Sequence, residues 1–322
     1  MADKAGKVSV IGTGIIGSTV AYTLLLKALA AEIMLVNRNE GRARAKEVDL
    51  SHCTPILEDT VIKHGSLKDS HDSDIVVVTC GMLPSERGTR MDVLPSNIEI
   101  FKSIIPEIAE YSPEAVIIVV TNPVDVMTYA AYRLSGFPRG RVIGSGTLLD
   151  TTRLKYILGR KFGLPPSGIE AVIVGEHGDS MVPVWSLASY MDEDLGKYLK
   201  DRNIDFDCGI KDDLLQQTRR AGWEIRLGNE HSCYGISLSV VRIIEGLLGF
   251  YGAPLPVSSL LRGEYGISEV CLSLPVKLGG KGIEETLPVV LSGEELFQLK
   301  NSASVLSGYV EQAESLIKKR TI

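Results

Sequence analysis

The first half of the chain alternates short apolar runs with helical patterns. Runs of strand length lie at residues 7–11, 32–37, 74–79 and 115–120, and the last two are apolar almost throughout. Between the strands, residues 15–30 are apolar at nearly every position, as in a buried helix, and residues 41–51 form a charged helical pattern. Continuous apolar strands are typical of parallel sheets covered on both faces. The pattern predicts an α/β fold, a doubly wound parallel sheet of βαβ units that extends to about residue 144.

The second half has a different pattern. Helical periodicity covers residues 148–162, 207–226, 237–250 and 293–319, and a short strand lies at 171–174. Alternating strands at 256–261 and 269–278 flank the turn sequence RGEYG, which favours an antiparallel unit. We therefore expect an α+β catalytic domain at 146–322 beside a first domain at 1–145. Because no linker separates them, we expect close packing with a ligand between the two.

Composition excludes several classes of protein. The chain has 322 residues, 44% hydrophobic and 23% charged, which is ordinary for a globular protein. A net charge of −6 without a block of Lys and Arg argues against nucleic-acid or anionic-membrane partners. No apolar run approaches the roughly 20 residues that span a bilayer. Because the first residues lead directly into a predicted strand, we expect no secretory signal. The five cysteines are widely spaced without a CxxC pair, so we expect reduced thiols, a cytoplasmic location and no metal site.

A glycine-rich segment follows the first strand. Residues 12–17 read GTGIIG and match GxGxxG, a fingerprint of Rossmann dinucleotide-binding domains when it follows a strand and opens a helix. Gly12 would allow the tight turn, Gly14 would let a pyrophosphate approach the backbone, and Gly17 would let the helix pack on the strand. The helix N-terminus at Ile15 and Ile16 would hold the phosphates. The alternative is a plain glycine-rich turn, which this context disfavours.

The end of the second strand favours NADP(H) over NAD(H). NAD-binding domains usually carry Asp or Glu there, whose carboxylate accepts hydrogen bonds from the ribose 2′-hydroxyl. This chain has Asn37, Arg38 and Asn39 instead. Without a carboxylate there is no repulsion of a 2′-phosphate, and Arg38 supplies a forked donor suited to it. The alternative is that Arg38 is only a solvated surface charge.

Two segments of the second half carry candidate catalytic groups. His177 lies in the glycine-flanked sequence GEHGD after a strand, where the imidazole can face a cleft and exchange a proton near neutral pH. Asp150 and Arg153 are three residues apart on a predicted helix and so share a face. Asp150 could orient the histidine and stabilise its imidazolium form, and Arg153 could bind a carboxylate with two hydrogen bonds. The alternatives are a structural histidine and an i,i+3 surface salt bridge of little value.

Four motifs occur in an order that resembles one enzyme family. GTGIIG at 12–17, TNPVDV at 121–126, GSGTLLDTTR at 144–153 and GEHGD at 175–179 are similar to the lactate/malate dehydrogenases. The resemblance runs over essentially the whole chain, and LDTTR combined with GEHGD is far more specific than the glycine motif. It implies an L-2-hydroxy-acid dehydrogenase, in which a hydride passes between a nicotinamide cofactor and a small 2-oxo acid. It also implies a homodimer or homotetramer.

The resemblance further implies the role of each site residue. His177 would be the proton donor and acceptor, Asp150 its partner and Arg153 the clamp on the substrate carboxylate. Asn122 would contact substrate and cofactor. Arg90, on a mobile loop at 81–90, would close over the site and polarise the reacting carbonyl. Further cofactor contacts are expected at Thr79, Gly81, Asn97 and Thr121.

Two positions depart from the family pattern and bear on substrate choice. The discriminating loop position, counted back from Arg90 without gaps, is Pro84, where malate enzymes carry Arg and lactate enzymes Gln. Pro84 offers neither charge nor donor, so oxaloacetate would bring an unpaired carboxylate into a closed site. Ser232 replaces the usual Thr on the opposite wall and leaves slightly more room. We therefore expect a 2-oxo acid with an uncharged side chain, branched-chain or aromatic, with pyruvate possible.

Three alternative functions are also open. Arg87 could reach into the site in place of Pro84, which would favour a malate dehydrogenase. A non-catalytic NADP-binding protein could retain this fold, although the intact set of Arg90, Asp150, Arg153 and His177 argues against it. A metal-dependent glycosidase on a related scaffold would need a Cys/His metal pair, and none is evident in the sequence. The dehydrogenase prediction requires that His177 and Arg153 face the same cavity.

Overall fold

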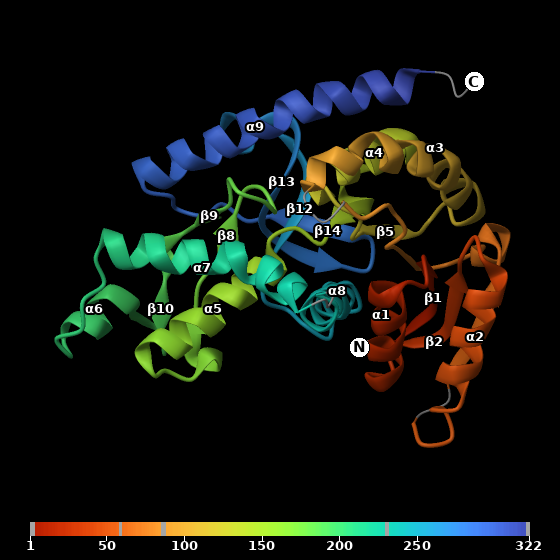
Figure 1. Ribbon diagram of the computed structural model, residues 1–322, viewed down its shortest axis with the longest axis horizontal. Helices are drawn as coiled ribbons and strands as arrows, with labels where there is room; N and C mark the ends of the chain where they lie inside the picture. The colour runs from red at the N-terminus through yellow and green to blue at the C-terminus, as the bar shows by residue number, and fades with distance from the viewer. Residues whose placement is uncertain (1–3, 58–59, 85–87, 229–231, 320–322) are drawn as a thin grey trace.

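A single large sheet forms the centre of the molecule. The computed structural model describes residues 4–57, 60–84, 88–228 and 232–319. Within these residues, nine strands follow one another in the order β14-β13-β12-β6-β5-β4-β1-β2-β3 (Figure 1). Strands β1 to β6 pair in parallel, as predicted. Their bounds are β1 Ala5–Ile11, β2 Ala30–Val36, β3 Val61–Gly65, β4 Ile75–Val78, β5 Val116–Val119 and β6 Val142–Gly144.

The antiparallel unit is present and continues this sheet. Strands β12 (Leu255–Arg262), β13 (Ser268–Gly279) and β14 (Gly282–Thr286) pair antiparallel with one another. Strand β12 joins the parallel part through the pair Ser258 and Gly144. The predicted antiparallel strands are therefore confirmed, and they extend the dinucleotide-binding sheet instead of forming a sheet of their own.

Helices cover both faces of the sheet. One face packs against α1 (Ile15–Leu26), α2 (Glu40–Ser51) and α8 (Tyr234–Leu247). The other packs against α3 (Leu94–Tyr111), α4 (Val124–Ser135) and α9 (Gly293–Lys318) (Figure 1). In β4, Ile75 and Val77 enter the first core whereas Val76 and Val78 enter the second. This explains the continuous apolar run, because a strand covered on both faces has no solvent side.

The predicted helix at 15–30 is too long. Helix α1 ends at Leu26, and the backbone turns at Ala28, whose φ is +50°, so that β2 can begin at Ala30. Apolar periodicity could not locate this boundary because the turn and the start of the next strand are also apolar.

A smaller lobe surrounds a third core. Helices α5 (Leu148–Phe162), α6 (Leu195–Lys200) and α7 (Cys208–Leu227) contribute most of its side chains. The short strands of this lobe are β7 Ile169–Glu170, β8 Ile173–Val174, β9 Val182–Pro183, β10 Ser189–Tyr190 and β11 Glu193–Asp194.

Short 3-10 helices occur along the described chain at η1 Leu67–Ser70, η2 Arg90–Val93, η3 Arg139–Arg141, η4 Pro166–Gly168, η5 Trp185–Leu187 and η6 Glu264–Gly266. Among the described helices, none combines the length and apolar character needed to cross a bilayer.

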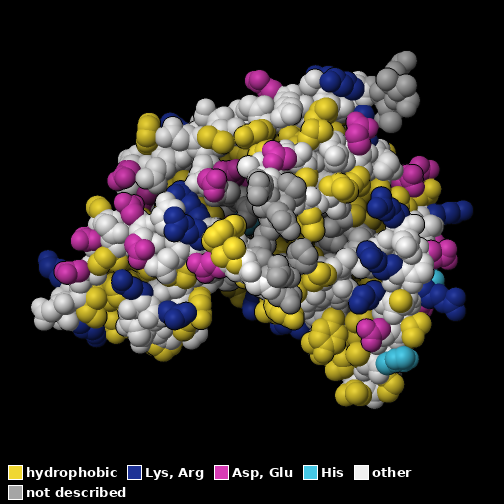
Figure 2. All heavy atoms as spheres, viewed as in Figure 1, with side chains coloured by type: hydrophobic (Ala, Val, Ile, Leu, Met, Phe, Trp, Pro, Cys, Tyr) yellow, Lys and Arg dark blue, Asp and Glu magenta, His cyan; other side chains and the backbone are white. Residues whose placement is uncertain are grey.

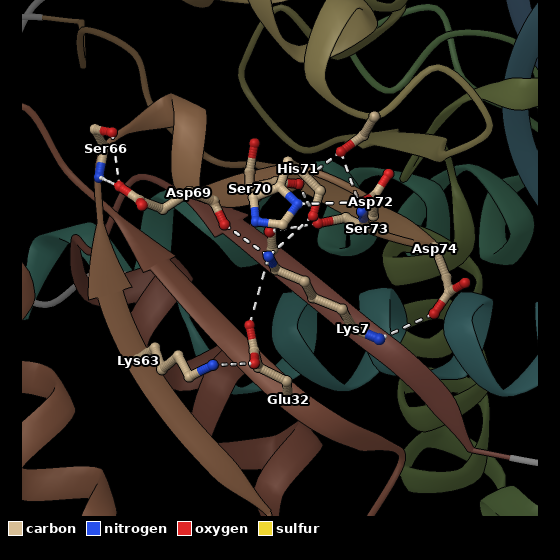
Figure 3. Close-up of polar contacts among 12 residues, drawn as sticks. Lys7, Glu32, Lys63, Ser66, Asp69, Ser70, His71, Asp72, Ser73 and Asp74 are labelled. Carbon is tan, nitrogen blue, oxygen red and sulfur yellow. Dashed lines mark hydrogen bonds and ion pairs between the residues drawn. The ribbon is translucent and has the colours of Figure 1, made fainter.

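A polar network closes the amino end of the parallel sheet (Figure 3). Lys7 Nζ donates to the carbonyl oxygens of Asp69 at 2.6 Å and His71 at 2.9 Å. Glu32 Oε2 forms a salt bridge with Lys63 Nζ at 2.6 Å, and Glu32 Oε1 lies 3.5 Å from Lys7 Nζ. Burial disfavours the charged form of Glu32, but the hydrogen bonds and charges of the two lysines outweigh it and lower its pKa. These groups satisfy one another, which leaves the carboxyl end of the sheet as the place for a ligand.

Candidate active site

The glycine loop connects β1 to α1 at the carboxyl end of the sheet. Gly12 has φ +102°, and a Cβ there would lie 2.7 Å from the Cys80 backbone nitrogen. A Cβ at Gly17 would overlap the Gly12 carbonyl oxygen. At Gly14, by contrast, a Cβ would meet no heavy atom within 4 Å. Two glycines are therefore required by close packing and the third faces open space, which fits the approach of a pyrophosphate to the first turn of α1.

The end of β2 carries Asn37 and Arg38, the two residues predicted there to contact the cofactor, followed by Asn39. Asn37 Nδ2 donates to Thr13 Oγ1 at 2.9 Å, and Asn37 Oδ1 accepts from the Asn39 backbone at 2.9 Å. Asn39 then caps α2 by accepting from the Arg42 backbone at 3.1 Å. Arg38 is exposed. In the view of Figure 2, several Lys and Arg side chains lie on the part of the surface that covers β1, β2 and α2. No residue at positions 37–39 carries a carboxylate.

The ends of β4 and β5 lie next to the glycine loop. Thr79 Oγ1 donates to the Gly12 carbonyl at 2.7 Å, and Thr121 Oγ1 donates to the Cys80 carbonyl at 2.7 Å. A Cβ at Gly81 would lie 2.5 Å from Thr121 Cγ2, so the chain needs glycine there. These side chains hold the loops together around the predicted cofactor site.

Asn97 and Asn122 have different surroundings. Asn97 is fully buried in α3, where its Oδ1 accepts from the Met82 backbone at 2.6 Å and its Nδ2 donates to the Asn122 carbonyl at 2.8 Å. Its amide is thus engaged with the protein. Asn122 Oδ1 is buried and has no hydrogen-bond partner within the described part of the chain. Buried acceptors are normally satisfied, so this atom fits the contact with a bound ligand expected of Asn122.

His177, Asp150 and Arg153 meet around one carboxylate. Asp150 Oδ2 lies 2.5 Å from His177 Nδ1, and Asp150 Oδ1 accepts from Arg153 Nη1 at 3.2 Å. The exposed fractions of the three side chains are 1% for Asp150, 13% for Arg153 and 10% for His177. The imidazole and the guanidinium therefore lie on the same small site, as the dehydrogenase prediction required. The alternative of a solvated i,i+3 pair does not fit, because Asp150 is buried and Arg153 is only partly exposed.

The loop that carries His177 is held by three different elements. The Gly175 backbone N–H donates to the Ser273 carbonyl on β13 at 2.9 Å. The backbone N–H of Glu176 donates to Ser302 Oγ on α9 at 2.9 Å. The backbone N–H of His177 itself donates to Asp125 Oδ2 on α4 at 2.8 Å. Sequence reasoning missed Asp125 and Ser302, although Asp125 is a charged residue in the otherwise apolar first turn of α4, within the TNPVDV motif.

The substrate wall is described in part. Arg153 Nη2 donates to Ser232 Oγ at 3.4 Å, so these two predicted substrate residues are brought together. On α7, a Cβ at Gly222 would lie 3.4 Å from Arg153 Nη2, and sequence reasoning missed this neighbour. Pro84 is half-buried. The backbone of Arg90 begins η2, but its side chain lies outside the described part, and Arg87 lies wholly outside it.

Within the described residues, no group of three or more His, Cys, Asp or Glu side chains is placed to hold a metal ion. The five cysteines are all free thiols.

The fold and the site together define a class of protein. A Rossmann sheet with a glycine loop, next to an imidazole and a guanidinium that share a buried carboxylate, is the architecture of a dinucleotide-dependent 2-hydroxy-acid dehydrogenase. The family model of the lactate/malate dehydrogenase NAD binding domain matches residues 6–144. The model of the lactate/malate dehydrogenase alpha/beta C-terminal domain matches residues 147–317. The chain belongs to the lactate/malate dehydrogenase family.

Individual relatives are similar over nearly their full length. The L-lactate dehydrogenase of Clostridium perfringens is 40% identical over 312 residues, 97% of this chain and 98% of the relative. That of Clostridium botulinum is 39% identical over 310 residues, 96% of this chain and 98% of the relative. The minor L-lactate dehydrogenase of Enterococcus mundtii, in its ligands-bound form, superposes with a TM-score of 0.90 at 29% identity, covering 96% of this chain and 99% of that structure. A lactate dehydrogenase from a Medee basin deep-sea metagenome gives 0.91 at 31% identity, with 97% and 100% covered.

Proposed function

We propose that this family member is an NADP(H)-preferring L-2-hydroxy-acid dehydrogenase whose 2-oxo acid carries an uncharged side chain. The observation that carries the proposal is that one buried carboxylate, that of Asp150, contacts both His177 and Arg153. This shared contact supports a proton-transfer role for His177 and an anion-binding role for Arg153 within one site. A 2-oxo acid has the matching pair, a carbonyl oxygen to be protonated and a carboxylate to be bound.

Each residue has a defined part in the proposed reaction. Arg153 binds the substrate carboxylate and sets its orientation. His177 in its protonated form gives a proton to the carbonyl oxygen, and Asp150 stabilises that imidazolium. Arg90 polarises the carbonyl, and Asn122 contacts substrate and cofactor. A bound nicotinamide dinucleotide supplies the hydride.

The side chain of the substrate follows from the walls of the site. Pro84 has no charge and no donor, so a second carboxylate would meet no partner there. Ser232, next to Arg153, is smaller than threonine. The relatives at 40% identity are named L-lactate dehydrogenases, which makes pyruvate the first acid to test. Branched-chain and aromatic 2-oxo acids follow, because serine at position 232 takes up less space than threonine. A preference for oxaloacetate would instead favour malate dehydrogenase and a role for Arg87.

The cofactor preference rests on the end of β2. Both polar ends of the Asn37 amide already bond to the protein, so it does not replace the carboxylate that NAD-binding domains place there. Arg38 is exposed and can meet a 2′-phosphate with two hydrogen bonds. Arg38 therefore favours NADPH.

A panel of 2-oxo acids, assayed with NADPH and NADH in parallel, tests the substrate class and the cofactor preference. We expect turnover of pyruvate or larger apolar acids, a clear preference for NADPH, and little activity with oxaloacetate. His177→Ala should abolish turnover while NADPH still binds. Equal rates with both cofactors would refute the role of Arg38, and full activity of His177→Ala would refute the catalytic assignment.

Assembly and location are also part of the proposal. We expect a homodimer or homotetramer in the cytoplasm. Tyr22 and Leu26 on α1 and Tyr234 and Leu238 on α8 are large exposed apolar side chains on two helices that pack together. Figure 2 shows hydrophobic side chains over the lower end of α1. Such surface is suited to a subunit contact, and sedimentation analysis of the purified protein measures the assembly.

A further inference from the structure

We propose that Asp125 is a positioning residue for His177, because its carboxylate holds the backbone of the catalytic loop against the segment that carries Asn122. This inference rests on the proposed function, since it concerns the same proton-transfer histidine. Asp125 contacts His177 through the main chain and so acts on the reaction through another residue.

The geometry gives Asp125 a special place among the supports of the loop. It is the second residue of α4, three residues after Asn122, and it is 3% exposed. Its Oδ2 accepts the N–H of His177 itself at 2.8 Å, whereas the other two supports hold Gly175 and Glu176. The contact spans two halves of the molecule, because α4 covers the dinucleotide-binding sheet. A shift of α4 would therefore move Asn122 and His177 together.

Burying an acidic side chain at this place costs free energy that a neutral hydrogen-bond acceptor would not cost. Burial, with smaller contributions from the charges of Glu176 and Asp150, raises the pKa of Asp125 to about 7, against the lowering effects of Ser258 and of the His177 N–H. Cys271 on β13 also faces it. Asp125 Oδ1 has no hydrogen-bond partner within the described residues. A buried polar side chain held at such a cost is more often functional than structural.

The acceptor role predicts a contrast between two substitutions. Asp125→Asn keeps an oxygen that can accept the His177 N–H, whereas Asp125→Leu has the same branched shape, a larger volume and no acceptor. Misplacing a reacting group by about 1 Å can lower the rate by about 10²-fold. We expect kcat of Asp125→Leu to fall by about that factor, and kcat of Asp125→Asn to stay within about fivefold of wild type. The Kd of NADPH should be unchanged in both, because the glycine loop is not touched.

A matched control separates positioning from loss of stability. Glu295 is another buried carboxylate that accepts backbone N–H groups, from Ser186 at 3.0 Å and Ser292 at 2.8 Å, at the start of α9 and outside the site. Glu295→Gln should lower Tm and leave kcat unchanged. The pH profile of kcat/KM gives a second reading, since Asp125→Asn removes a group that titrates near neutrality and should change the profile where Glu295→Gln does not.

The outcomes distinguish this inference from the proposed function. If wild-type protein reduces no 2-oxo acid, the proposed function fails. If wild type is active and a folded Asp125→Leu retains at least half of its kcat, or if Asp125→Asn is as slow as Asp125→Leu, positioning by the acceptor is refuted. Hydrogen–deuterium exchange of the wild-type His177 amide gives a test that needs no variant. Protection of this amide supports the proposal, and exchange as fast as in an exposed loop overturns it.

Discussion

Replacing Asp150 by Asn turns one buried carboxylate into an amide of nearly the same shape. The carboxylate contacts His177 Nδ1 through Oδ2 at 2.5 Å and Arg153 Nη1 through Oδ1 at 3.2 Å. An amide has one acceptor oxygen and one donor nitrogen, so it can satisfy only one of these partners. The other would face an N–H group where it now has a negatively charged acceptor.

The loss of charge sets the size of the effect. Two unit charges about 4 Å apart interact by about 4 kcal/mol at an effective dielectric of about 20, and burial of Asp150 and His177 leaves little water to screen them. Asp150→Asn removes this interaction from the imidazolium that donates the proton in the proposed reductive reaction. At about 1.4 kcal/mol for each factor of ten, kcat should fall by about 10³-fold.

Steady-state reduction of the best 2-oxo acid measures kcat, and fluorescence titration measures the Kd of NADPH. We expect the Kd to stay within about twofold, because the glycine loop and the end of β2 are unchanged. Asp179→Asn is the matched control, since it removes an exposed carboxylate two residues from His177, and surface substitutions of this kind change energies by at most about 0.5 kcal/mol. A variant of Asp150 that binds NADPH normally and keeps more than a tenth of the wild-type kcat would show that the shared carboxylate is not needed.

Three further substitutions test other parts of the site. Arg38→Ala should raise the KM of NADPH by about 10-fold or more while that of NADH stays nearly constant, and equal changes for both cofactors would contradict this. Gly222→Ala should be tolerated, because its Cβ would lie at contact distance, 3.4 Å from Arg153 Nη2. The larger Gly222→Val should displace the guanidinium and raise the KM of the 2-oxo acid by about 10-fold or more, with an unchanged KM as the contrary result. Burial raises the pKa of Asp125 from 3.8 to about 7, so the native state keeps a proton that the unfolded chain releases between about pH 4 and 7. The free energy of unfolding of wild type should therefore fall as pH rises through this window, by up to roughly 4 kcal/mol relative to Asp125→Asn. Urea titrations of both proteins over this pH range measure the difference, and a constant difference would contradict the prediction.

The sequence was most informative where a requirement is local. The glycine loop could be predicted because Gly12 needs a positive φ and Gly17 needs contact with the chain five residues before it. The strand cores could be predicted because Ile75 to Val78 alternate between two covered faces. The pair of Asp150 and Arg153 could be placed on one helical face by their spacing, and the structure shows that the two side chains contact each other and are little exposed.

Long-range features could not be read from the pattern. The hydrogen bond from the His177 N–H to Asp125 joins residues that are 52 positions apart, and nothing local marks either as a partner of the other. The join of the antiparallel strands to the parallel sheet rests on one pair, Ser258 with Gly144. Both depend on how separate elements pack, which single-sequence periodicity does not contain.

A continuous set of hydrogen bonds and short chain segments links the two sides of the site. In order it passes through Met82, Asn97, Asn122, Asp125, His177, Asp150, Arg153 and Ser232. The first part belongs to the dinucleotide-binding sheet and the last to the smaller lobe. In the proposed reaction, hydride transfer needs the nicotinamide, expected beside the first part, at a fixed distance from the substrate, expected beside the second. Asp125 links the two parts, because its backbone continues from Asn122 and its side chain holds the backbone of His177. We therefore propose that the relative placement of cofactor and substrate depends on this buried carboxylate.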